Sequence, residues 1–236
     1  MQLGKRQVFS QKQANVIAEA NARWNILSGA VRSGKTYGSF FLLPLRVAEQ
    51  GEGNFLLVGK TERTLKRNII DPLRNLYGPD CVSQVYGDGL VDIFGRRCYV
   101  VGANDERAVT KIQGIGLVYA YGDEVTTWPE SFFEMLKSRL DKPGAKFDGT
   151  CNPGSPHHWL KQFIDNTDGR WLKHFHFQLD DNPFLDPDFV EALKTEYTGM
   201  WYQRYILGQW VVAEGVVYDM FDAARRVTED IPNIKK

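Results

Sequence analysis

Compact runs of hydrophobic residues alternate along this chain with longer segments in which apolar residues recur at helical spacing. The compact runs are bounded by glycine or polar residues, which predicts strands, and the longer segments predict helices. The predicted strands are residues 24–28, 54–60, 97–103, 116–124, 146–154 (ending in a turn) and 170–179, and the predicted helices are 11–23, 37–50, 61–78, 129–140 and 157–164.

Proline and glycine positions qualify this pattern at three places. Pro44 and Pro72 fall inside the second and third predicted helices. Because proline has no backbone N–H, Pro44 predicts a kink and Pro72 predicts a break. The segment 82–94 has two short apolar arms around the turn sequence GDG, which predicts a β-hairpin.

The alternation of strands with helices predicts an α/β fold with a mostly parallel sheet. Towards the C-terminus the pattern changes to a polar, proline-marked loop at 180–189 and an aromatic-rich helical segment at 190–210. This change predicts a division into a core, residues 1–178, and a smaller subdomain, residues 179–236.

Composition narrows the class of protein without identifying it. The 236 residues are 43% hydrophobic and 13% aromatic, which is typical of a globular protein and not of a disordered one. Lysines plus arginines number 29, as do the acidic residues, so any contact with nucleic acid must be local or must arise in an assembly. Three scattered cysteines, no signal peptide and no run of membrane-spanning length predict a soluble intracellular protein without a membrane partner.

A phosphate-binding loop is the strongest chemical signal. The residues from Gly29 to Thr36 read GAVRSGKT and fit G-x-x-x-x-G-K-[ST] between a predicted strand and a predicted helix. Its glycines allow backbone N–H groups to surround phosphate oxygens, and a chance glycine turn fits the full pattern poorly. Lys35 is expected to reach the β- and γ-phosphates of ATP, and the Thr36 hydroxyl to hold Mg²⁺. The predicted nucleotide-binding set is Gly29, Arg32, Ser33, Gly34, Lys35 and Thr36.

Arg32 lies inside this loop, although the general pattern does not require it. One hypothesis is an ion pair with an acidic residue that braces the loop. The other is a catalytic role, in which the guanidinium points at the γ-phosphate and neutralises charge in the transition state.

Two adjacent carboxylates end the apolar strand at 116–124. Asp123 is expected to hold Mg²⁺ through water, and Glu124 to orient and deprotonate the attacking water. A solvated acidic strand end is the simpler interpretation of this pair alone. Together with the upstream loop, the pair predicts hydrolysis, because a kinase must exclude water from its site.

Four stretches together resemble the ATPase domain of the large terminase subunit of tailed phages. They are the loop GAVRSGKT with its internal arginine, KIQGIGLVYAYGDE, GTCNPGSPHHWLKQF, and DDNPFL followed by GMWYQRYILGQWVVAEGVVYDMF. The resemblance spans nearly the whole chain and implies an additional-strand, RecA-like P-loop NTPase core of three layers with a small lid or linker subdomain. It implies an ATPase motor that moves double-stranded DNA into a prohead.

The same resemblance implies partners and a location. The family assembles as a ring, usually a pentamer, at the portal vertex of the prohead in the host-cell cytoplasm, together with portal protein and the small terminase subunit. It also implies a following nuclease domain, which we expect to be absent because the chain stops at Lys236.

The resemblance also suggests further site residues. Asn152 or Thr150, in the coupling-motif position, is expected to contact the attacking water or the γ-phosphate, and the alternative is an Asn-Pro turn that only ends a strand. Gln13 is expected to read the adenine edge, with Phe9 available to stack, although a solvated glutamine is nearly as good an interpretation. Arg139 is expected to act on the γ-phosphate of a neighbouring subunit, unless it is an ordinary surface arginine.

The segment 60–74 carries five basic and two acidic residues, a net charge of +3. It is expected either to follow a DNA backbone or to face the nucleotide, and a solvated helix face is the simpler alternative. Two rival functions stay open for the chain: a helicase or repair ATPase acting on DNA, and an ATP-dependent assembly or switch protein. The helicase would need a second RecA-like lobe, and the switch protein would not need Glu124.

Overall fold

One seven-stranded sheet forms the centre of this computed structural model, which describes residues 9–212. The strand order is β3-β4-β2-β5-β6-β1-β7, and every neighbouring pair is parallel except β3 and β4. The mostly parallel α/β prediction is therefore confirmed. The strands are β1 Trp24–Gly29, β2 Asn54–Gly59, β3 Leu90–Ile93, β4 Arg96–Gly102, β5 Leu117–Gly122, β6 Lys146–Cys151 and β7 Leu172–Phe177.

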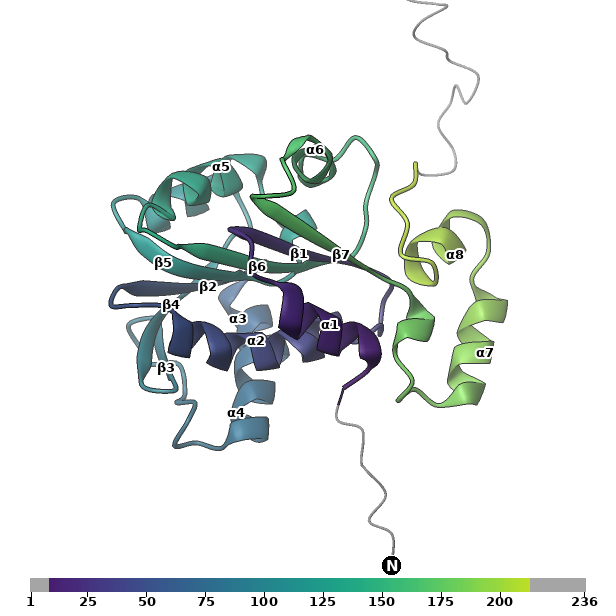
Figure 1. Cartoon of the computed structure of the whole chain (residues 1–236), viewed down its shortest axis with the longest axis horizontal. Helices are drawn as coiled ribbons and strands as arrows, with labels where there is room; N and C mark the ends of the chain where they lie inside the picture. The colour runs from purple at the N-terminus through teal and green to yellow at the C-terminus, as the bar shows by residue number, and fades with distance from the viewer. Residues whose placement is uncertain (1–8, 213–236) are drawn as a thin grey trace, which may run out of the picture.

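Helices cover both faces of the sheet (Figure 1). On one face lie α1, α2, α3 and α4, and on the other lie α5 and α6, while α7 and α8 pack beyond the end of β7. Within residues 9–212, no helix is long and apolar enough to cross a bilayer. The helices are α1 Gln11–Glu19, α2 Lys35–Glu49, α3 Glu62–Leu65, α4 Asp71–Tyr77, α5 Glu130–Arg139, α6 Trp159–Asn166, α7 Pro187–Glu196 and α8 Gly199–Tyr205.

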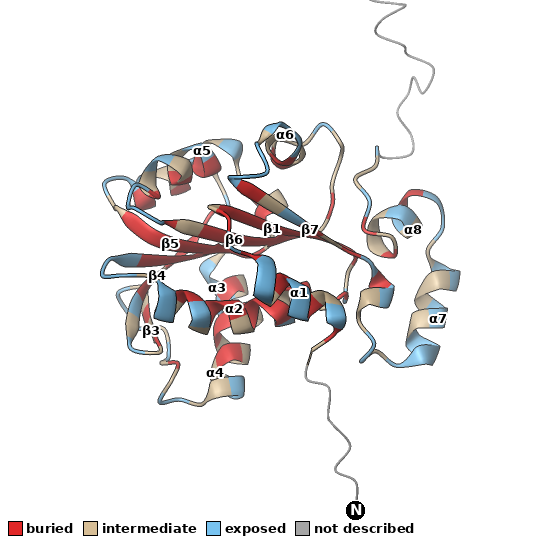
Figure 2. Cartoon of the chain, in the orientation of Figure 1, coloured by how far each residue is buried: buried red, intermediate tan, exposed pale blue. Residues whose placement is uncertain are grey.

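Successive residues of the central strands point into two different cores. In β2, Leu56 and Val58 pack with residues of α5 and α6, whereas Phe55 and Leu57 pack with residues of α2 and α4. The sheet is thus buried on both sides, as the burial colouring of Figure 2 shows. This double burial explains why its strands appear in the sequence as continuous apolar runs.

Pro44 is accommodated inside an unbroken α2. Because proline has no N–H, the carbonyl oxygen of Phe40 lacks its usual helical donor. The phenolic hydroxyl of Tyr77 donates to that oxygen at 3.2 Å. A side chain from α4 therefore satisfies the carbonyl that the proline leaves free.

The break predicted at Pro72 is wrong. The chain stays helical through α3, a π-helical turn at Lys66–Ile70 and then α4. In the π turn the amide of Asp71 donates to the carbonyl of Lys66, five residues back. Pro72 then occupies the start of α4, where its missing N–H is tolerated.

The predicted hairpin at 82–94 is only partly correct. The turn forms, because the Tyr86 N–H donates to Leu90 O at 2.8 Å and the Gly89 N–H to Tyr86 O at 3.0 Å. The first arm, however, meets β3 at one isolated bridge, between Val82 and Ile93. The regular partner of β3 is the following strand, β4, which continues the main sheet.

The C-terminal segment is helical in two pieces. A turn at Tyr197 and Thr198 separates α7 from α8, and α7 already begins at Pro187, inside the predicted loop. Both helices pack around Leu179 and Ile206, which form a small core with Ala30. The division at residues 178 and 179 stays a prediction, and residues 213–236 lie outside the described part.

A buried ionic cluster fastens α2 to the sheet. Arg46 of α2 donates to Asp148 of β6 at 2.7 and 3.1 Å, and both side chains are at most 3% exposed. Asn25 of β1 and Tyr119 of β5 donate to the same carboxylate at 2.8 and 3.0 Å. One carboxylate therefore ties the helix that follows the phosphate-binding loop to three adjacent strands.

We expect Asp148→Ala to lower the free energy of unfolding by about 3–5 kcal/mol, because the buried Arg46 would lose its buried partner and keep only the half-exposed Glu49, at 2.8 Å. Urea denaturation measures this loss. The control is Lys66→Ala, which removes an exposed ion pair with Asp71 and should cost less than about 1 kcal/mol. Equal losses in the two variants would contradict the role of the buried cluster.

Candidate active site

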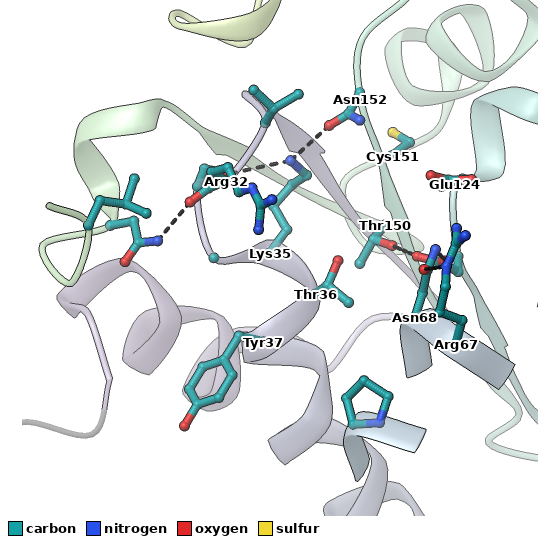
Figure 3. A pocket seen from close by; sticks show the side chains of 17 residues that line it. Arg32, Lys35, Thr36, Tyr37, Arg67, Asn68, Glu124, Thr150, Cys151 and Asn152 are labelled. Atoms are coloured by element: carbon teal, nitrogen blue, oxygen red, sulfur yellow. Dashed lines mark hydrogen bonds between the residues drawn. The ribbon is translucent and has the colours of Figure 1, made fainter. Parts of the chain in front are cut away.

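A pocket of about 500 Å³ opens at the carboxyl ends of β1, β5 and β6 (Figure 3). Parallel α/β sheets commonly bind ligands at this edge. The loop between β1 and α2 forms one wall, and the ends of β5 and β6 form another. The segment between α3 and α4 and the loop before α7 complete it.

Gly34 ends the phosphate-binding loop and caps the N-terminus of α2. Its φ of 87° lies in the left-handed region, which favours glycine. A Cβ here would also lie 2.5 Å from Nε2 of Gln13. The glycine thus lets a 15-residue helix begin at the pocket, where the N–H groups of its first turn favour an anion.

Lys35 lies across the floor of the pocket. Its ammonium donates to the carbonyl oxygens of Gly29 and Ala30 at 2.9 and 2.5 Å, and to Oδ1 of Asn152 at 3.1 Å. Burial lowers the pKa of Lys35 to about 8, and nearby acidic groups offset part of that effect. A buried ammonium bonded mainly to neutral oxygens can still bind a strong anion.

Asp123 follows β5 and is 4% exposed. Thr150 donates to its Oδ1 at 3.1 Å and Asn68 to its Oδ2 at 3.3 Å, so both carboxylate oxygens are held. Burial raises the pKa of the Asp123 carboxyl, while the hydrogen bond from Asn68 opposes the rise. The indole of Trp128 fixes the backbone by donating to the Asp123 carbonyl at 3.2 Å.

Glu124 lies at the wall of the same pocket in a strained conformation. Its φ of 53° is left-handed, which is uncommon for a residue other than glycine. Its carbonyl accepts from the N–H and the hydroxyl of Thr127, both at 2.8 Å. These contacts hold the turn in which the Glu124 side chain is presented to the pocket.

The side chains of Thr36 and Asp123 both line the pocket, one from α2 and the other from the end of β5. A hydroxyl and a carboxylate are hard oxygen donors, which is the donor type that Mg²⁺ requires. The arrangement therefore fits the predicted Mg²⁺ ligands, Thr36 directly and Asp123 through water.

The end of β6 connects the two halves of the site. Thr150 donates to Asp123, and Asn152 accepts from Lys35. The carbonyl of Asn152 also accepts from the Thr126 hydroxyl at 3.1 Å, beside Glu124. Thr150 thus contacts a predicted Mg²⁺ ligand, and Asn152 contacts a predicted nucleotide-binding residue.

Arg32 is exposed and lines the pocket beside Lys35 (Figure 3). No carboxylate pairs with its guanidinium among residues 9–212, and the loop is braced instead by Asn182, which donates to the Arg32 carbonyl at 2.7 Å. The backbone of Arg32 is left-handed, with a φ of 56°. This arrangement leaves the guanidinium available to a ligand.

Gln13 supports the phosphate-binding loop from behind. Its Nε2 donates to Gly34 O at 2.9 Å, its Oε1 accepts from the Ser10 N–H at 2.8 Å, and it is 1% exposed. Phe9 packs edge-on against Phe41, with ring centroids 4.4 Å apart. Contacts of Gln13 and Phe9 with adenine stay predictions.

Arg139 lies outside the pocket of its own chain. It ends α5, close to the backbone carbonyls of Lys137 and Leu140, to which Arg23 donates at 3.3 and 2.8 Å. Arg23 immediately precedes β1, so Arg139 lies at the sheet edge opposite the phosphate-binding loop. Arg139 does not line the pocket of its own chain, and its action on a neighbouring subunit stays a prediction.

The sequence did not single out several residues that line the pocket. Arg67 and Asn68 reach it from the π turn, Tyr37 from α2, and Asn182 from the loop before α7. The net positive charge of residues 60–74 was the only signal for Arg67, and facing the nucleotide was one of three interpretations of that charge. A π turn has no sequence signature, so the positions that it aims at the pocket were not predictable.

Known proteins match the chain over most of its length. A family model described as "Terminase large subunit, T4likevirus-type, N-terminal" matches residues 26–225. The large terminase of a thermophilic bacteriophage, solved in complex with ADP, is 35% identical, with a TM-score of 0.79. That match covers 92% of this chain and 57% of the other, so the chain spans little more than half of that relative's length. No match is found among curated proteins.

Two further structures extend the comparison. The same thermophilic phage terminase in complex with ATP-γ-S matches with a TM-score of 0.77 and 35% identity, covering 92% of this chain and 56% of that one. The ATPase domain of the Thermus phage P74-26 large terminase matches with a TM-score of 0.58 and 12% identity, covering 85% and 93% of the two chains. The latter likeness concerns the fold alone. The predicted RecA-like P-loop fold is confirmed.

Proposed function

The chain belongs to the large terminase subunit family, and we propose that it is the ATP-hydrolysing motor domain that drives double-stranded DNA into a phage prohead. One observation carries the proposal: the acids Asp123 and Glu124 at the end of β5 face the same pocket as Lys35 and the N-terminus of α2. This is the arrangement that ATP hydrolysis needs, with triphosphate on one side and the activation of water on the other.

The proposed binding of ATP uses the loop and the start of α2. The backbone N–H groups at Gly34 and the first residues of α2 receive the phosphates, and Lys35 exchanges its contacts with loop carbonyls for the β- and γ-phosphates. Thr36 and Asp123 would hold Mg²⁺, which would neutralise phosphate charge when bound.

In the proposed hydrolysis, Glu124 accepts a proton from the attacking water as the water oxygen bonds to the γ-phosphorus. The bond from that phosphorus to the β–γ bridging oxygen breaks, and ADP and phosphate leave. Lys35 and Arg32 offset the negative charge that develops. Asn152 and Thr150 contact Lys35 and Asp123, so a change at the γ-phosphate is passed to the end of β6.

The proposal extends to the assembly. As a packaging motor, the domain would act in a ring, with a pentamer expected, at the portal vertex of a prohead in the host-cell cytoplasm. Its partners would be double-stranded DNA, portal protein and the small terminase subunit. In that ring Arg139 would reach the γ-phosphate of a neighbouring subunit.

Phosphate release from ATP, measured with and without double-stranded DNA, tests the proposed function. We expect magnesium-dependent turnover that is raised by DNA and by higher protein concentration, because a completed site needs a neighbour. ATP binding without turnover would favour an assembly or switch protein. Strand separation in a parallel assay would favour a helicase.

Subunit mixing tests Arg139. Arg139→Ala subunits lack the trans arginine, and Glu124→Gln subunits lack the base, so each alone should be nearly inactive. In mixed rings, an Arg139 from a Glu124→Gln subunit can serve an intact site beside it. We expect about a quarter of the wild-type rate at equal amounts, since half of the sites keep Glu124 and half of those have a neighbour with Arg139. No recovery in rings shown to be mixed would contradict the trans role.

A further inference from the structure

The π turn between α3 and α4 brings a cation to the pocket from the side opposite the phosphate-binding loop. Arg67 and Asn68, both in this turn, line the pocket (Figure 3). The Arg67 Nε donates to Oδ1 of Asn68 at 3.1 Å, and Nδ2 of Asn68 donates to Oδ2 of Asp123 at 3.3 Å. A continuous chain of hydrogen bonds thus connects an arginine to the acid that ends β5.

The π turn itself is anchored in the core. Leu65, Ile69 and Ile70 are at most 1% exposed and pack with strand residues beneath them. A π turn contains more residues than an α turn, which rotates the intervening side chains relative to a regular helix. With the apolar residues fixed below, Arg67 and Asn68 are held at the pocket wall. Such turns recur at functional sites.

Two other basic residues close to Arg67 in the sequence, Lys66 and Arg63, do not line the pocket. Lys66 forms an ion pair with Asp71 at 2.7 Å, and Arg63, which is exposed like Arg67, does not line the pocket. Arg67 lines the pocket, and within residues 9–212 it forms no ion pair. Its terminal nitrogens, Nη1 and Nη2, therefore remain available to bind an oxyanion in the bidentate way that guanidinium favours.

We propose that Arg67 is a catalytic residue that binds the γ-phosphate of ATP within the same subunit, and that Asn68 is a positioning residue that holds Arg67 beside Asp123. The inference rests on the proposed function. Lys35 and Arg32 approach the triphosphate from the phosphate-binding loop, whereas Arg67 approaches from the side of the acids. Cations on both sides of the transferred phosphoryl group stabilise the charge on its equatorial oxygens.

Nucleotide affinity tests Arg67 without relying on turnover. We expect Arg67→Ala to weaken the binding of ATP-γ-S with Mg²⁺ about 10-fold and to leave ADP affinity within about twofold, because only the triphosphate presents a γ-phosphate. The kcat for ATP should fall about 100-fold, with Arg67→Lys between the variant and the wild type. Arg63→Ala is the matched control and should leave all these values unchanged.

Asn68 is tested by its effect on Asp123 and on Arg67. Asn68→Ala should raise the Mg²⁺ concentration needed for half-maximal ATP-γ-S binding about threefold to tenfold, because one Asp123 oxygen loses its donor. At saturating Mg²⁺, the double variant with Arg67→Ala should bind ATP-γ-S little worse than Arg67→Ala alone, since Asn68 then has no guanidinium left to position. A purely structural role of Asn68 would lower the melting temperature but leave the Mg²⁺ requirement and the affinity for ATP-γ-S unchanged.

The outcomes separate this inference from the proposed function. If the wild type fails to hydrolyse ATP, the proposed function is wrong, whereas turnover that persists in Glu124→Gln would overturn only the assignment of the base. If turnover depends on Glu124 but Arg67→Ala binds ATP-γ-S and hydrolyses ATP like Arg63→Ala, only the role of Arg67 is wrong. A loss of DNA affinity in Arg67→Ala with unchanged nucleotide binding would also overturn it, by making Arg67 a contact for DNA phosphates. Equal melting temperatures confirm that the variants fold.

Discussion

Replacing Lys35 by alanine is expected to weaken ATP binding at least ~100-fold and to reduce turnover at least ~1,000-fold. The ammonium is the only cation of the loop that lies buried under the pocket, where water screens it little. The N–H groups of α2 would remain, but no positive charge would replace Lys35 between the loop and Asn152. Binding of a fluorescent ATP analogue and phosphate release measure the two losses.

The fold should survive this substitution. Burial already disfavours the charged form of Lys35, as its lowered pKa shows, so removing the ammonium relieves a desolvation cost. Lys60→Ala provides the control, because Lys60 is exposed and lies outside the pocket. If Lys35→Ala keeps near-normal turnover and a normal melting temperature, the proposed role of the phosphate-binding loop in ATP hydrolysis is wrong.

Glu124→Gln is expected to reduce turnover by ~100-fold to 10,000-fold while ATP affinity stays within about threefold. Glutamine keeps the size of the side chain, but it cannot accept the proton of the attacking water. Because Asp123, Thr36 and Lys35 are untouched, the triphosphate should bind as before. Single-turnover hydrolysis and equilibrium binding distinguish the two effects.

Glu130→Gln is the matched control, since Glu130 is an exposed residue at the start of α5 and does not line the pocket. It should hydrolyse ATP at the wild-type rate. If Glu124→Gln keeps more than about a tenth of the activity, the base must be another group, because general-base catalysis contributes ~100-fold or more.

Much of the core fold was predictable, because buried strands leave a simple pattern of apolar residues in the sequence. The strands of a parallel sheet covered on both faces are rich in apolar residues, and β2 after its first residue and β5 show this plainly. The carboxyl ends of such strands meet at one edge, so the loop after β1 and the acids after β5 were correctly expected in one place. Thr150 and Asn152 at the end of β6 follow the same logic.

The features that were not predicted from the sequence depend on tertiary contacts, which a local sequence pattern does not reveal. Pro72 predicts a break by its chemistry, but the buried Ile69 and Ile70 hold the segment helical through a π turn. That turn is what presents Asn68 to Asp123. Similarly, the amide of Gln13 is used within the protein, in a capping box with Ser10 and a bond to the loop, which only the packing of α1 on α2 determines.

The most direct measurement is a crystal structure of this chain with Mg²⁺ and a non-hydrolysable ATP analogue. The account predicts the β- and γ-phosphates against the N-terminus of α2 in contact with Lys35, with Glu124 facing the γ-phosphate across the same pocket. A nucleotide bound elsewhere on the molecule, or a triphosphate at the loop with Asp123 and Glu124 turned away from it, would contradict the account.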